Sequence, residues 1–127
     1  MATNVKEMLA AANATVPKIS YEDARKMMQE GKALVVDVRD APEVQAGGKI
    51  KGALNVSRGM LEFLADADSP YHDKSFVKDR PIMVYCAAGG RSALSGKVLK
   101  ELGYQNVHNL GAFKSWVDSG GEIEKVS

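Results

Sequence analysis

The chain has 127 residues, the length of one domain at roughly 100–150 residues per domain. Its 17 Lys and Arg against 16 Asp and Glu give a formal net charge of +1, whereas a nucleic-acid-binding protein needs a clear excess of basic residues. With 45% hydrophobic and 26% charged residues and no apolar run longer than seven residues, the composition is that of a soluble globular protein and excludes both general disorder and a membrane span.

The first residues predict a short amphipathic helix. Asn4 suits an N-cap, and the apolar residues that follow it recur at helical spacing: Val5, Met8, Leu9 and Ala12. We expect residues 1–16 to form a helical appendage and residues 17–127 to form the main domain. No basic segment followed by an apolar stretch opens the chain, which predicts a cytoplasmic protein.

Helices and strands alternate along the rest of the chain. Ser20 caps a helix that ends at Gly31 and buries Ala24, Met27 and Met28. The β-branched apolar run 33–38 is typical of a strand covered on both faces in a parallel sheet. The next stretch, 40–51, contains Pro42, Gly47 and Gly48 and is predicted to be mostly loop. After it we expect a strand at 53–56, a helix at 60–65 and a surface loop at 66–74.

The C-terminal half repeats this alternation. It predicts a strand at 81–85, a helix at 91–102 that buries Leu94, Val98 and Leu102, a strand at 106–110 and a short helix marked by Phe113, Trp116 and Val117. Strands alternating with helices indicate an α/β fold with a mainly parallel sheet.

Cys86 stands where a ligand site is expected in such a sheet, beyond the carboxyl end of a strand. As the only cysteine it forms no intramolecular disulfide, and with two well-separated histidines it forms no cysteine-rich zinc site. Four small residues follow it before a helix begins near Arg91, and Gly89 and Gly90 allow positive φ. Such a loop turns backbone N–H groups toward one point and would hold Cys86 as a thiolate nucleophile. The alternative is a buried core cysteine.

Three segments carry a family resemblance. Cys86–Ser92 resembles the active-site loop of the rhodanese family of sulfurtransferases, written C-x-x-G-x-R/T-S. Asp37–Glu43 resembles the family's D-V-R-x-x-x-E segment, and Gly48–Val56 resembles its G-H-I-x-G-A-x-N segment. Order and spacing match from about Ile19 to Gly120. Lys49 stands where the family usually has histidine, so no role of that histidine is carried over.

The resemblance implies one rhodanese-like domain with a mainly parallel five-stranded sheet flanked by helices, to which the N-terminal helix is added. It implies that Cys86 carries sulfur as a persulfide, taken from thiosulfate or a persulfide and passed to cyanide or a thiol. The expected partners are these small molecules or a protein sulfur donor or acceptor, with no nucleic acid and no membrane. No metal or organic cofactor is required.

Two alternatives remain open. Cysteine-dependent phosphatases and arsenate reductases use a loop one residue longer than the four residues between Cys86 and Arg91, which is wide enough for a tetrahedral phosphate. A non-enzymatic rhodanese-like binding module is the other alternative, although such modules often lack the cysteine.

The remaining site residues are predicted around this loop. The substrate-binding loop is expected to comprise Ala87, Ala88, Gly89, Gly90, Arg91 and Ser92. Arg91 would organise the loop or meet the donor's charge, and Ser92 would either hydrogen-bond the sulfur or cap the helix. Supporting positions are a structural charge cluster of Asp37, Arg39 and Glu43, and Arg58, which lies near the pocket mouth or is simply exposed. His72 and His108 are given no catalytic role.

Overall fold

A computed structural model describes residues 2–126 and contains two sheets. The central sheet is parallel, in the order β3 (Leu54–Asn55), β1 (Leu34–Asp37), β4 (Ile82–Cys86) and β5 (Val107–Ala112). A small antiparallel sheet pairs β2 (Lys49–Ile50) with β6 (Ile123–Glu124). The predicted α/β class with a mainly parallel sheet is therefore confirmed.

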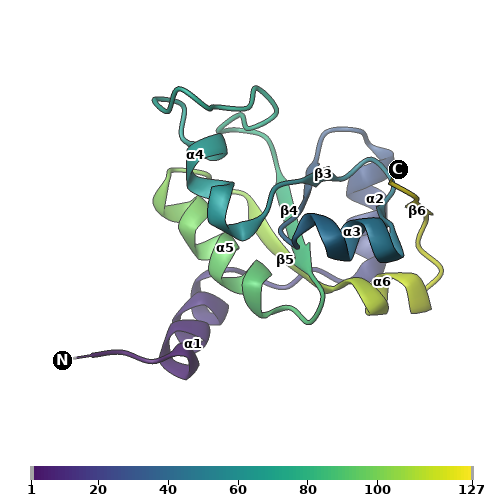
Figure 1. Ribbon diagram of the computed structural model, residues 1–127, viewed down its shortest axis with the longest axis horizontal. Helices are drawn as coiled ribbons and strands as arrows, with labels where there is room; N and C mark the ends of the chain where they lie inside the picture. Colours follow the sequence, from purple (N-terminus) through teal and green to yellow (C-terminus); the bar gives the residue numbers. More distant parts are fainter. Residues whose placement is uncertain (1, 127) are drawn as a thin grey trace.

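Helices cover both faces of the central sheet. They are α1 (Val5–Thr15), α2 (Tyr21–Gln29), α3 (Ala41–Gly47), α4 (Leu61–Ala65), α5 (Gly90–Glu101) and α6 (Phe113–Asp118), with a 3-10 turn η1 (Arg58–Met60) before α4. Figure 1 shows α4 and α5 on one side of the sheet, α2 and α6 on the other, and α1 beside α5 at the end farthest from the C-terminus. No helix within residues 2–126 has the length and hydropathy needed to cross a bilayer.

The central strands divide the core into two clusters, because successive side chains of a strand point to opposite faces. Val36 packs in one cluster with Leu99 of α5. Val35 packs in the other with Trp116 of α6. Cys86 belongs to the first cluster, so its side chain lies on the face that α5 covers.

The central sheet has four strands where five were expected. Residues 17–19 lie where a fifth strand would pair, along the outer edge of β5. Asn109 donates its N–H to the Pro17 carbonyl at 2.8 Å, and Ile19 donates to the Asn109 carbonyl at 3.2 Å. Pro17 has no N–H with which to extend the pairing, so the segment forms a single bridge, between Lys18 and Asn109, instead of a strand.

The prediction of a loop over 40–51 is wrong, since this stretch contains α3 and β2. Glu43 accepts the N–H of Asp40 at 2.9 Å and so satisfies a free donor where the helix begins. Pro42 lies in the first turn, where its missing N–H is harmless. The helix ends at Gly47, and its C-cap Gly48 has a φ of +79°, which favours glycine. The residues that suggested a loop therefore mark the two ends of a helix.

The predicted burial along α5 is also wrong in detail. Leu94, Val98 and Leu102 are only half-buried, whereas the fully buried residues are Ser92, Ala93, Ser95, Gly96 and Leu99. These are mostly small residues, because α5 is covered by the sheet and also by α1 and needs a close approach to both. The helix predicted at 60–65 begins slightly earlier, with the 3-10 turn. The division of the chain at residues 16 and 17 stays a prediction.

Candidate active site

The loop after β4 joins the sheet to α5 at the point where parallel strands present their carboxyl ends. Gly89 caps α5 with a φ of +100°, a conformation that requires glycine. A Cβ there would make only an ordinary contact, 3.7 Å from the Gly111 Cα, so the positive φ is what favours glycine. Cys86 is only 1% exposed, whereas Ala87 and Ala88 lie exposed on the surface. The loop thus wraps around a buried sulfur.

Hydrogen bonds from the loop surround this sulfur. Gly89 donates its N–H to the Cys86 Sγ at 3.0 Å and Ser92 donates its N–H at 3.4 Å. The thiol in turn donates to the Ser92 hydroxyl at 3.4 Å. Burial raises the pKa of Cys86, but hydrogen bonds from Ser92, Gly89 and Ala88 outweigh it, so the pKa lies below its ordinary value. The site therefore stabilises the thiolate more than water does around an ordinary cysteine.

Arg91, in the first turn of α5, forms an ion pair next to the loop. Its Nη1 and Nη2 donate to the two carboxylate oxygens of Glu43 at 2.8 and 2.9 Å. This hydrogen bond to Arg91 is the main reason that the pKa of Glu43 falls to about 2, and the Asp40 N–H adds to it. The pair ties the start of α5 to the start of α3. Glu43 thus forms its ion pair with Arg91, whereas the other two members of the predicted charge cluster, Asp37 and Arg39, pair with each other.

Asp37 and Arg39 form a separate buried ion pair at the end of β1. The Arg39 Nη2 donates to Asp37 at 2.7 Å and to the Gly48 carbonyl at 2.8 Å. The Tyr85 hydroxyl donates to the same carboxylate at 2.6 Å. Burial, and then this hydrogen bond, raise the pKa of Tyr85, which keeps its proton in place. The Arg39 guanidinium lies 4.3 Å from the centre of the Phe113 ring. This network joins β1, β4 and α6.

Two other positions from the sequence lie apart from the loop. Arg58 donates to Glu62 at 2.8 Å and lines a hollow of about 290 Å³ between α1 and α5. Lys49, which replaces the family's usual histidine, donates to the Ala53 carbonyl and lies 3.3 Å from Glu124. It thereby fastens β2 to β6.

Asn109 is a site residue that the sequence did not predict; it is only 4% exposed and connects β5 to the loop. The Ser92 hydroxyl donates to its Oδ1 at 2.7 Å, and its Nδ2 approaches the Gly89 carbonyl at 3.4 Å. The one signal in the sequence was an asparagine in mid-strand, where this residue type is rare.

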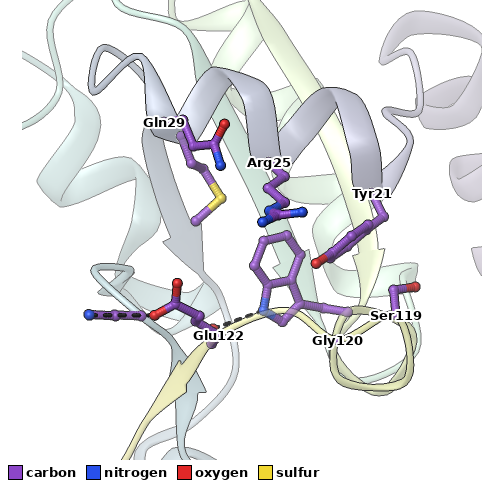
Figure 2. A pocket seen from close by; sticks show the side chains of 9 residues that line it. Tyr21, Arg25, Gln29, Ser119, Gly120 and Glu122 are labelled. Atoms are coloured by element: carbon purple, nitrogen blue, oxygen red, sulfur yellow. Dashed lines mark hydrogen bonds and ion pairs between the residues drawn. The ribbon is translucent and has the colours of Figure 1, made fainter.

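One surface hollow adjoins the active-site loop, and a second lies on the other face of the central sheet. One of about 510 Å³ is lined by Ala88, Gly89 and Gly90 and by Leu9 of α1, which lies beside Gly90. The other, of about 380 Å³, lies on the opposite face of the sheet, where Tyr21 and other α2 residues face the segment 119–122 (Figure 2). No cluster of three or more metal-ligating side chains occurs within residues 2–126.

Comparison with known proteins shows which family the chain belongs to. Residues 20–119 match the rhodanese-like domain. The chain belongs to the rhodanese-like family. A human thiosulfate:glutathione sulfurtransferase is 28% identical over 112 residues, covering 83% of this chain and 96% of its own. The thiosulfate sulfurtransferase GlpE of Pseudomonas paraeruginosa is 32% identical over 104 residues, covering 80% and 84%.

A solved structure resembles more of the chain. A Rhodopseudomonas palustris CGA009 protein of unknown function, described as a possible tyrosine phosphatase, is 38% identical, with a TM-score of 0.89 and coverage of 98% of this chain and 96% of its own. At that coverage the match includes most of α1, which precedes the rhodanese-like domain. The comparisons together support a rhodanese-type sulfurtransferase at the level of the family.

Proposed function

We propose that this rhodanese-like protein is a sulfurtransferase that carries sulfane sulfur on Cys86. The observation that carries the proposal is the buried sulfur beside two backbone N–H groups and one hydroxyl, which lower the pKa of the thiol. Thiolate is the attacking form in exchange at sulfur. The names of the two curated relatives support thiosulfate as a donor and a thiol as an acceptor.

The reaction takes two displacements at sulfur. In the first, the Cys86 thiolate attacks the outer sulfur of thiosulfate, the sulfur–sulfur bond of the donor breaks, and sulfite leaves with the electron pair. In the second, an acceptor thiolate or cyanide attacks the outer sulfur of the Cys86 persulfide, and the Cys86 thiolate leaves. The N–H groups of Gly89 and Ser92 donate to the Cys86 Sγ, so they stabilise the thiolate that attacks in the first displacement and leaves in the second. A persulfide or a protein-bound donor would enter by the same first step.

The test is the intact mass of the protein after incubation with thiosulfate, and separately with glutathione persulfide. We expect a gain of one sulfur atom that cyanide removes, and no gain in Cys86→Ser, whose hydroxyl stays neutral at pH 7. Since the chain has one cysteine, the adduct needs no further mapping. Sulfur uptake by Cys86→Ser with an unchanged circular dichroism spectrum would refute the proposal.

A phosphatase is the second candidate, favoured by the description of the R. palustris structure as a possible tyrosine phosphatase. Against it stands the loop, which has four residues between Cys86 and Arg91 and is one residue shorter than a phosphatase loop. We expect aryl phosphate hydrolysis to stay at background. Turnover that is lost in Cys86→Ser would show that the phosphatase assignment is right. If neither reaction occurs, a binding module remains.

The proposed chemistry also bears on location. Cys86 must stay a free thiol between turnovers, and a reducing compartment maintains free thiols. We therefore propose a cytoplasmic location, where small thiols are available as acceptors.

A further inference from the structure

We propose that Asn109 is a positioning residue for the Cys86 sulfur: its side-chain oxygen holds the hydroxyl hydrogen of Ser92 while the sulfur is a neutral thiol, and gives it up when the sulfur becomes an anion. The inference concerns the acidity of Cys86, and it rests on the proposed function only for its relevance to sulfur transfer. In physical terms, the Asn109 Oδ1 and the Cys86 Sγ compete for the hydroxyl hydrogen of Ser92.

The Ser92 hydroxyl has one hydrogen and three acceptors within reach. The Asn109 Oδ1 lies at 2.7 Å, the Gly89 carbonyl at 3.1 Å and the Cys86 Sγ at 3.4 Å. The shortest of these contacts is to Asn109. With its hydrogen committed there, the Ser92 oxygen accepts the hydrogen of the neutral thiol. Ser92 therefore acts as an acceptor toward the thiol and must rotate to become a donor toward the thiolate.

The orientation of the Asn109 side chain is fixed by the backbone. Gly111 donates its N–H to the same Oδ1 at 2.9 Å, so this atom is the oxygen and not the nitrogen of the amide. The β4–β5 pairing shifts at this point, since Val84 faces Asn109 and Tyr85 faces Gly111, which leaves Leu110 as an extra residue. Such a bulge redirects a side chain beside a functional site.

The switch leaves no buried group without a partner. When Ser92 turns toward the thiolate, the Asn109 oxygen keeps the N–H of Gly111 as its donor. The sulfur then has the Ser92 hydroxyl as a third donor in addition to the N–H groups of Gly89 and Ser92. Asn109 consequently competes with the sulfur anion for one hydrogen, and it restrains the acidity that the loop would otherwise give to Cys86.

The test is the pH titration of the Cys86 thiolate, followed by its ultraviolet absorbance and by the midpoint of the alkylation-rate profile. We expect Asn109→Ala to lower the thiol pKa by about half a unit to one unit, since a neutral hydrogen bond then shifts from the amide to the sulfur. We expect Ser92→Ala to raise the thiol pKa. In the Ser92→Ala background, Asn109→Ala should have no effect, because Asn109 acts only through Ser92.

The double-mutant cycle separates this role from a merely structural one. If Asn109→Ala raised the thiol pKa, left it unchanged, or shifted it equally in both backgrounds, the proposal would be wrong. Asn109→Asp is the second variant should Asn109→Ala not fold. Its added charge raises the thiol pKa in both backgrounds, and we expect a larger rise with Ser92 present, because the carboxylate binds the hydroxyl hydrogen more strongly; an equal rise would overturn the proposal.

No variant changes the charged side chains around the loop, although Asn109→Asp adds one more charge. These side chains are Arg91 on α5, Glu43 on α3, Asp37 and Arg39 at the end of β1, and Lys18 beside β5. The titration does not require sulfur transfer. Failure of the wild type to take up sulfur would therefore refute the proposed function and leave the hydrogen-bond switch to be judged by the titration alone.

Discussion

Few charges near the sulfur are available to a substrate. Ala87 and Ala88 are exposed but uncharged, and both terminal nitrogens of Arg91 already donate to Glu43. A doubly charged donor such as thiosulfate would thus be met mainly by backbone N–H groups. A persulfide with an apolar or peptide part depends less on such a charge.

Adding a cation at the exposed loop position should therefore change donor choice. We expect Ala87→Arg to lower the KM for thiosulfate about fivefold or more, since one charge-assisted hydrogen bond contributes ~1–3 kcal/mol. The KM for glutathione persulfide should change less. Steady-state kinetics with both donors provides the measurement, and Ala87→Gln is the uncharged control. Equal changes for both donors would show that this position does not set donor choice.

The Arg91–Glu43 ion pair predicts a pH dependence of stability. Because the folded-state pKa of Glu43 is lowered to about 2, the pair stabilises the protein above the unfolded pKa of about 4.5 and loses this effect as the pH falls toward 2. Both side chains are 36% exposed, so we expect only about 0.5–1 kcal/mol. Urea unfolding of Glu43→Gln should show that loss at pH 7 and a smaller one at pH 3. Glu62→Gln, which breaks the exposed Arg58 pair, serves as the control; an equal loss there would deny the Arg91 pair a special role.

The N-terminal helix and α5 meet at a glycine. A Cβ at Gly96 would lie 2.8 Å from the Val16 Cγ1, which is closer than side chains pack. Nearly two turns earlier on both helices, Leu9 of α1 lies against Gly90, the first residue of α5. Thus α1 contacts the helix that begins at the active-site loop, and its packing and that of the loop are linked.

The Gly96→Ala variant tests this contact. Alanine favours a helix over glycine by ~1 kcal/mol, but overpacking costs ~1–3 kcal/mol, so we expect a net loss of stability. In a Val16→Ala background the steric clash is relieved, and the same substitution should become neutral or stabilising. The midpoint of urea unfolding for the four proteins completes the cycle. If Gly96→Ala destabilised both backgrounds equally, the close contact would not be the cause.

At the scale of the whole molecule, His108 makes folding sensitive to mild acid. Its Nδ1 is buried without a hydrogen-bond partner, and burial, followed by the charge of Lys100, lowers its pKa. The unfolded state therefore binds a proton first, and stability falls as the pH drops below about 6.5, by at most ~1.4 kcal/mol per pH unit. Thermal unfolding between pH 7.5 and 5 should depend less on pH in His108→Leu than in the wild type. An equal pH dependence in the two proteins would show that His108 is not the cause.

Local patterns sufficed for most of the fold. Asn4 and Ser20 begin α1 and α2 as expected, since N-cap side chains act within one turn. The buried runs that became β1 and β4 were equally clear. Helix α3 was not predicted because Pro42, Gly47 and Gly48, which mark its two ends, are equally common in loops. Strands β2 and β6 have two residues each and pair across 73 or more positions, which no local pattern reveals.

In the candidate site, too, contacts within one segment could be predicted from the sequence and contacts between segments could not. The sequence of the loop indicated both Cys86 and the N–H groups around it, because consecutive residues build that geometry. It did not indicate that Glu43 would pair with Arg91, or that Asn109 would reach Ser92, since each contact joins separate elements and depends on how the helices and strands dock. Three-dimensional packing decides such partners.

The segment that joins α1 to the domain has a further consequence, for behaviour in concentrated solution. An uncovered sheet edge presents free N–H and C=O groups on which a strand of another molecule can form. Here β3 offers an edge of only two residues, and residues 17–19 occupy the edge of β5. Pro17 and the exposed Lys18 are residue types that natural sheets use against intermolecular pairing. We therefore expect residues 17–19 to lower the tendency of the sheet to aggregate, an effect that the chemistry of Cys86 does not require.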